Sequence, residues 1–172
     1  MARLPLRDAS FGRQNFQRVY AHSPNGLLKQ AAFHAYLREQ SPLDRRLREL
    51  AIMQVGYAAN CPYAYAHHVK AAVDAGVPDG DIRAVADESA GRPTGLEPLA
   101  KAVLRTARDL TAGYTVSDAT FAELQQGLDA EQVMDLLFTI TCYASMSKLL
   151  LTLQVELEDH YRTYLERFPI AT

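Results

Sequence analysis

Signals that start and stop helices recur along this chain, and the residues between them have helical spacing. Ser-Pro pairs occur at 23–24 and 41–42, where serine suits the N-cap and proline the first helical position. The segment "AGVPDGD", from residue 75, supplies a glycine and then a proline, which is typical of a helix end. Runs of alternating β-branched residues, which would indicate strands, are missing from the sequence. The pattern therefore predicts an all-α fold of roughly seven to nine helices.

Length and composition indicate one folded domain over residues 1–172. Hydrophobic residues make up 48% of the chain, which is enough to build a buried core. The formal net charge is -2 and no long basic run is present, so we expect no nucleic acid partner. The N-terminal sequence lacks the apolar region of a signal peptide, and two cysteines do not make a disulfide framework. We therefore expect a cytoplasmic protein.

The most apolar stretch covers residues 133–153 and is preceded by Asp129 and Gln132 at capping-box spacing. Polar residues, among them Asp135 and Lys148, interrupt this stretch, which argues against a membrane span. We expect this stretch to be buried or to face another subunit, and residues 129–168 to form either one long helix or two helices with a bend.

The reactive side chains gather in "NCPYAYAHH", residues 60–68. Pro62 favours a helix start here, which places Cys61 at the N-cap or in the first turn. Unpaired backbone N–H groups and the positive end of the helix dipole favour a thiolate at that position. Helical spacing puts Cys61, Tyr65 and His68 on one face, but His68 lies roughly 10 Å further along the axis. A substrate, a water molecule or a third side chain could fit between the two.

Glu49 is the candidate for that third side chain. It lies 12 residues before Cys61, on the preceding helix. Because the chain must turn sharply at "YAANCP", the two helices should pack as an antiparallel pair, and Glu49 and His68 can meet across it. A carboxylate beside an imidazole orients the ring and raises its pKa, which suits a general base or acid.

Each of these residues also has a purely structural explanation. Cys61 can be a small buried hydrophobe, His68 a structural or surface histidine, and Glu49 an ion-pair partner of neighbouring arginines. The tyrosines at 63 and 65 can be packing residues. We expect His67 to face solvent or an interface, and Cys142 to lie in the core.

The combination of Glu49, Cys61 and His68 resembles the signature of the alkylhydroperoxidase D and carboxymuconolactone decarboxylase superfamily. The resemblance extends over about residues 15–160, with its core at about 41–76. In the peroxidase branch a second cysteine stands three residues after the first, and this chain has Ala64 there. A dithiol cycle within the motif is therefore excluded.

The resemblance implies an all-helical fold, assembled as homo-oligomers such as trimers or hexamers, with a small-molecule substrate and no metal or organic cofactor. It implies that His68 is the general acid or base, that Glu49 orients it, and that Cys61 is a nucleophilic thiol or a pocket wall. The other implied pocket residues are Tyr63, Ala64, Tyr65, Tyr143 and Ser147.

Three functions remain open at this point. The first is a cofactor-free lyase or isomerase that moves protons on a small carboxylate or lactone, with Arg45 or Lys148 as the cation for an anionic substrate. The second is a one-thiol peroxidase in which Cys61 forms a sulfenic acid that an external thiol reduces. The third is a non-catalytic helical oligomer that binds a ligand.

Overall fold

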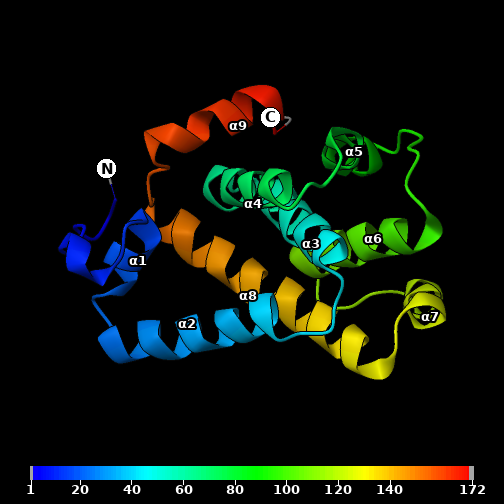
Figure 1. The fold of residues 1–172 in the computed structure, drawn as a ribbon, viewed down its shortest axis with the longest axis horizontal. Coiled ribbons are helices and arrows are strands. Elements are labelled where there is room, and N and C mark those ends of the chain that lie inside the picture. The colour runs from blue at the N-terminus through cyan, green and yellow to red at the C-terminus, as the bar shows by residue number, and fades with distance from the viewer. Residues whose placement is uncertain (1, 171–172) are drawn as a thin grey trace.

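The computed structural model describes residues 2–170, and within this range all regular secondary structure is helical, as the sequence predicts (Figure 1). In chain order the elements are η1 (Ala9–Phe11), α1 (Asn15–Tyr20), α2 (Pro24–Glu39), α3 (Arg45–Ala58), α4 (Pro62–Asp74), α5 (Asp79–Ser89), α6 (Pro98–Ala112), α7 (Asp118–Gly127), α8 (Ala130–Leu153), η2 (Asp159–Tyr161) and α9 (Arg162–Arg167).

Helix α3 forms the centre of the fold. It packs against α4, α5, α6 and α8, and every residue from 47 to 56 is buried. The sequence predicts this, because two apolar stripes on the helix leave no wholly polar face. The buried stretch also contains Arg48 and Glu49, so two charged side chains lie inside the core.

A tight turn joins α3 to α4. Asn60 adopts a left-handed conformation with φ of 47°, and the Cys61 N–H donates to the Gly56 carbonyl at 2.8 Å. Cys61 is the N-cap of α4 and Pro62 its first residue, as the sequence predicts. The turn brings α4 back against α3 and fixes which of their side chains meet.

Close contact between α3 and α4 depends on Gly56. A Cβ atom added there would lie 2.8 Å from the Tyr65 backbone nitrogen and 3.0 Å from its Cα atom. We expect Gly56→Ala to lower the free energy of unfolding by about 1–3 kcal/mol, because backbone atoms cannot move aside as a flexible side chain can. Urea denaturation measures this, with Gly80→Ala as the control, since no atom lies within 4 Å of its added Cβ. Equal stability of the two variants would contradict the prediction.

Helix α8 is continuous over 24 residues and ends at Leu153, so residues 129–168 contain two α-helices, α8 and α9, and not one long helix. The predicted capping box of Asp129 and Gln132 is present, and Gln154 ends the helix with φ of 52°. By length and composition alone this helix could cross a membrane, yet 44% of its apolar window is buried in the fold. Figure 1 shows it between α2 and the α3–α4 pair. One face of α8 is thus a core surface, as the sequence suggests.

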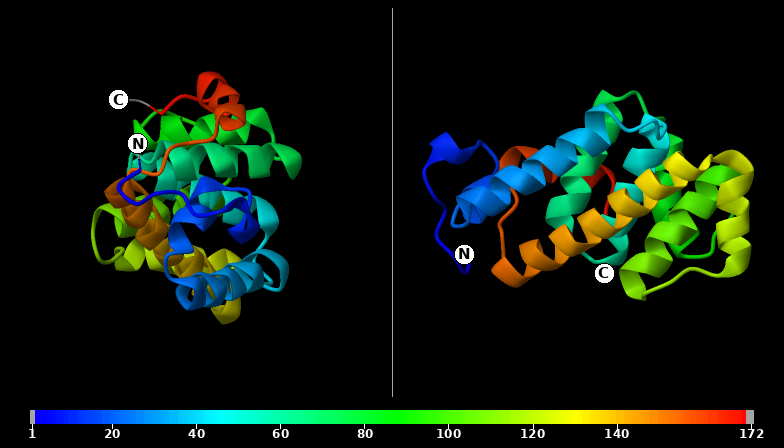
Figure 2. Two further views of the ribbon diagram at one scale, coloured as in Figure 1. Left: turned by 90° about the vertical axis from the view of Figure 1, so that its left-hand side faces the viewer. Right: turned by 90° about the horizontal axis from the view of Figure 1, so that it is seen from below.

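Segments from both ends of the described range meet beside α4 (Figure 2). The Asn15 backbone N–H donates to the Glu158 carboxylate at 2.6 Å, and the Asn15 side chain donates to the Glu156 carbonyl at 2.9 Å. These contacts hold the start of α1 against the chain that follows α8. Both segments therefore contribute residues to the wall of a pocket beside α4.

Candidate active site

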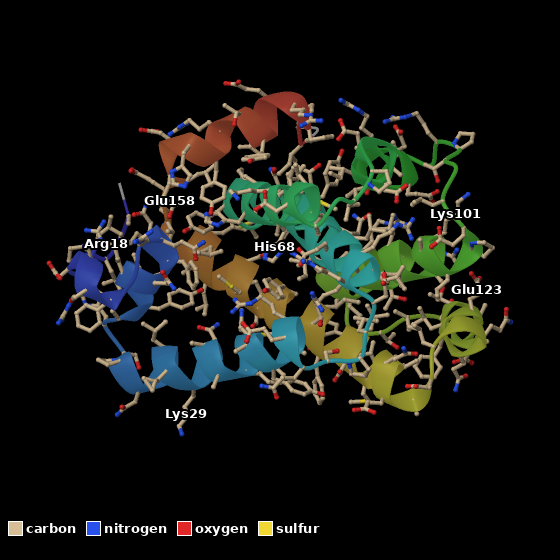
Figure 3. The ribbon with its side chains drawn as sticks, viewed as in Figure 1. Arg18, Lys29, His68, Lys101, Glu123 and Glu158 are labelled. Atoms are coloured by element: carbon tan, nitrogen blue, oxygen red, sulfur yellow. The ribbon has the colours of Figure 1, made fainter. Side chains whose placement is uncertain are left out.

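Glu49 and His68 meet across the α3–α4 pair, as their spacing and the sharp turn predict. The Glu49 Oε2 atom lies 2.8 Å from His68 Nδ1, and both side chains are largely buried. Figure 3 shows His68 near the centre of the molecule. The carboxylate accepts a hydrogen bond from the Nδ1–H group, so in the tautomer that this contact favours Nε2 is the nitrogen without a proton.

The charge on Glu49 is maintained despite its burial. Desolvation alone would raise the pKa of this carboxyl group. The hydrogen bond and charge of His68, together with Arg48 and Arg45, outweigh that effect and hold the pKa below its usual value. Glu49 is therefore a carboxylate at neutral pH and can fix the orientation of the imidazole.

His68 lies in the wall of a pocket with a volume of about 240 Å³. Its Nε2 atom makes no hydrogen bond with any of residues 2–170. The rings of Tyr143 and His68 meet edge to face at a centroid distance of 4.7 Å. Half of the residues in the pocket wall carry an aromatic or imidazole ring, namely Phe16, His34, Tyr63, His67, His68, Tyr143 and Tyr161.

Cys61 is outside this pocket wall and is only 1% exposed. Burial raises the pKa of its thiol, and this outweighs the backbone N–H groups of Ala64 and Tyr63, which favour a thiolate. The Ser147 hydroxyl lies near the thiol and also lowers its pKa, although it forms no hydrogen bond of standard geometry with a described residue. The expectation of a stabilised thiolate is therefore wrong, because desolvation outweighs the helix N-terminus.

The other predicted pocket residues divide into two groups. Tyr63, Ala64 and Tyr143 line the pocket. Tyr65 instead packs against Tyr57, with ring centroids 5.8 Å apart, and is not part of the wall. Ser147 is fully buried behind the pocket, on the side of Cys61.

His67 is not exposed, contrary to the sequence-based expectation. Its ring stacks between Tyr63 and Tyr161 at centroid distances of 4.4 and 3.7 Å. Its Nε2 atom donates to Glu158 at 2.8 Å, and its Nδ1 atom accepts from Gln14 at 3.3 Å. Since both ring nitrogens are occupied, His67 holds the pocket wall together and is not free to exchange protons with a substrate.

Glu158 is the centre of this contact group and was not identified from the sequence. Its carboxylate accepts hydrogen bonds from Tyr63, from His67 and from the Asn15 backbone. Glu158 is 91 residues away from His67 in the chain. The tyrosines and histidines next to His68 in the sequence indicate a functional site. No pattern in the sequence indicates that Glu158 contacts them.

The contacts of Glu158 predict that the folded state loses stability at acidic pH when this carboxylate is protonated. Although desolvation opposes it, the donors around Glu158 lower its pKa from 4.5 to about 2. A lowered pKa stabilises the folded state above pH 4.5, and this contribution is lost as the pH falls from 4.5 to about 2. We expect Glu158→Gln to be less stable than the wild type at neutral pH and to lose less stability over that acidic range.

Thermal melting across the acidic range tests this prediction. Glu166→Gln is the matched control, because Glu166 is exposed on α9. If Glu158→Gln and the wild type lost stability in parallel between neutral and acidic pH, Glu158 would not be the group responsible.

Positive charge at the pocket comes from Arg38 and Lys70. Lys70 is paired with Asp74 at 2.5 Å, and Arg38 contacts Glu39 at 3.3 Å. The predicted cations Arg45 and Lys148 are exposed and are not in the pocket wall, so that expectation is wrong. Across residues 2–170, no group of three His, Cys, Asp or Glu side chains is arranged to hold a metal ion.

Comparison with known proteins agrees with this architecture. Residues 27–109 match the carboxymuconolactone decarboxylase family. No functionally curated protein matches the sequence significantly. A peroxidase-related protein from Ralstonia eutropha JMP134, described as an alkylhydroperoxidase AhpD core, has 17% identity and a TM-score of 0.77, over 95% of each chain.

Two further solved structures share the fold. The debrominase Bmp8, in complex with 2,3,4-tribromopyrrole, has 14% identity and a TM-score of 0.79, over 90% of this chain and 82% of its own. A putative antioxidant defence protein AhpD from Agrobacterium tumefaciens has 16% identity and a TM-score of 0.70, over 81% of this chain and 94% of its own. Residues 27–109, which contain the Glu49, Cys61 and His68 motif, thus match the carboxymuconolactone decarboxylase family, and the chain has the fold of these AhpD-like proteins.

Proposed function

We propose that this protein is a cofactor-free lyase or isomerase that moves protons on a small carboxylate or lactone. The observation that carries the proposal is the 2.8 Å contact between Glu49 and His68, with His68 in the pocket wall. A neutral imidazole oriented by a carboxylate can take a proton from one substrate atom and return it to another.

The neighbouring groups support proton transfer beside a carbonyl or carboxylate. Glu49 holds Nδ1–H of His68, so Nε2 is the atom that accepts the substrate proton. Burial raises the pKa of Tyr143, which keeps its hydroxyl protonated. That hydroxyl makes no hydrogen bond with a described residue, and it can donate to an oxygen on which negative charge develops.

Arg38 favours an anionic substrate. It is an exposed residue of the pocket wall, where an entering carboxylate would meet it, whereas Lys70 is already paired with Asp74 of the same wall. A volume of about 240 Å³ suits a small molecule. These features support a substrate with one or two carboxylate groups.

A one-thiol peroxidase that uses Cys61 is the second candidate, and an external thiol would have to reduce its sulfenic acid. It is favoured by the likeness to a peroxidase-related protein and to a putative antioxidant AhpD protein. Against it stand the burial of Cys61, its raised pKa and its position outside the pocket wall. A pocket that only binds ligand within a homo-oligomer is the third candidate.

We also propose that the protein forms a homo-oligomer, a trimer or hexamer, through the outer face of α8. Four large apolar side chains on that helix are exposed, namely Met134, Phe138, Leu149 and Leu151. Light scattering coupled to gel filtration would give the assembly mass, and a monomer at micromolar concentration would overturn this proposal.

Turnover of a panel of unsaturated lactones and β-keto acids tests the proposed function. The wild type and Cys61→Ser are expected to turn over the same compounds at similar rates, because proton transfer does not use the thiol. Loss of activity in Cys61→Ser, together with peroxide consumption by the wild type, would favour the peroxidase. A pocket that binds these compounds without turnover would favour the third candidate.

A further inference from the structure

A second thiol, Cys142, lies beside an imidazole. Its Sγ atom on α8 is 3.1 Å from Nε2 of His34 on α2, within hydrogen-bond range for sulfur. Cys142 is partly exposed, and it is not bonded to the other cysteine. The thiol therefore has both a proton acceptor and a route to solvent.

His34 places a ring nitrogen in contact with the thiol of Cys142. The residue is 7% exposed, and its burial lowers the pKa to about 4, so the imidazole is neutral at pH 7. Its ring lines the pocket, and Nδ1 makes no hydrogen bond with any residue of the described chain. A ligand in the pocket could therefore accept a hydrogen bond from Nδ1–H while Nε2 takes the proton of Cys142.

Cys61 has no such neighbour. Its thiol is almost fully buried, and the groups that act on it are two backbone N–H groups and the Ser147 hydroxyl. Both cysteines have a pKa that burial raises, so neither is a thiolate at rest. Reaction at neutral pH then requires a base in contact with the sulfur, and among the described residues only Cys142 has an imidazole in that position.

Arg38 indicates the class of reagent. It follows His34 by one turn on α2, and both side chains line the main pocket and a smaller adjoining pocket of about 120 Å³. A guanidinium group there would attract a carboxylate to the vicinity of the thiol.

We propose that Cys142 and His34 form a nucleophilic thiol–imidazole pair, a modification site for small carbon electrophiles that carry a carboxylate. In the step, Sγ attacks the electrophilic carbon and the S–C bond forms. The bond to the leaving group breaks, and the leaving group, such as a halide, departs with the electron pair. The thiol proton passes to Nε2 of His34 and then to water. This site is distinct from the Glu49–His68 pair and does not depend on turnover of a substrate.

Alkylation of the intact protein by iodoacetate and by iodoacetamide, followed by mass spectrometry of both cysteine peptides, tests the proposal. We expect Cys142 to react at least about 10-fold faster than Cys61 with either reagent. His34→Gln should slow Cys142 by about 10-fold or more and leave Cys61 unchanged. His22→Gln is the control, because His22 is exposed and its ring forms a hydrogen bond with the Pro5 carbonyl, away from both cysteines in the sequence. Arg38→Gln should slow iodoacetate several-fold more than iodoacetamide.

The pH dependence of Cys142 alkylation in the wild-type protein provides a second test. It needs no variant with a substitution at a buried position. A thiol that reacts only as the free thiolate slows about 100-fold from about pH 7.5 to about pH 5.5. With His34 as the base, the Cys142 rate should change less than about 3-fold over that range. A full 100-fold change at Cys142, faster reaction of Cys61, or an unaltered Cys142 rate in folded His34→Gln would each overturn the proposal.

Discussion

Replacement of His68 by asparagine is expected to lower kcat for the turned-over lactone or keto acid by about 10²–10⁴-fold. The asparagine side-chain amide can still donate to Glu49 from about the position of Nδ1, so the buried carboxylate keeps a partner. No basic nitrogen remains at the position of Nε2, which faces the pocket. Steady-state kinetics measures the effect, and we expect KM to change much less than kcat, because the lost contact acts in the transition state.

His22→Asn is the matched control for that substitution. It makes the same chemical change at an exposed histidine that is not part of the pocket wall. The control should keep wild-type kcat and KM. If His68→Asn retained more than about a tenth of the wild-type kcat, His68 would not be the proton-transfer group, and the proposed mechanism would be wrong.

Replacement of Glu49 by leucine is expected to lower the free energy of unfolding by about 3–5 kcal/mol, because it leaves a buried charge without compensation. Arg48 is 5% exposed, and its side chain makes no hydrogen bond with a residue of the described chain. Its nearest opposite charge is Glu49, with Nε 3.9 Å from Oε1. Urea denaturation gives the change in stability.

A double-mutant cycle separates the charge effect from packing. Arg48→Leu in the Glu49→Leu background removes the unpaired guanidinium, so the double variant should recover part of the lost stability. Asp87→Ala is the control for removal of a carboxylate. The ion pair of Asp87 with Arg92 is exposed, so it should contribute less than about 1 kcal/mol to the free energy of unfolding. A loss of under about 1 kcal/mol in Glu49→Leu would mean that Arg48 is solvated in the variant.

The meeting of Glu49 and His68 could be predicted because it is a local consequence of the chain. The two residues are 19 apart, and the turn at Asn60 to Pro62 leaves α4 only one way to return along α3. Helical periodicity then decides which side chains meet. The all-helical fold follows from the same periodic pattern, which is strong over most of the chain.

The contacts that the sequence did not predict are those made by distant segments. The sequence predicts solvent or an interface for His67, because its partners Gln14, Glu158 and Tyr161 come from distant segments of the chain. Cys61 was expected to have a stabilised thiolate, but its environment depends on how α8 covers α4. No pattern in the nearby sequence predicts the surroundings of His67 or of Cys61, because both depend on how distant segments pack in the whole domain.

The position of Gln14 and Tyr161 in the pocket wall links ligand occupancy to the order of the short elements α1 and η2. Short elements at the surface usually open at a lower free energy than a helical core, so the pocket would lose two of its wall residues while α3 and α8 remain folded. A bound ligand opposes that opening by mass action. Occupancy should therefore slow amide hydrogen exchange in α1 and η2 more than in α3 and α8.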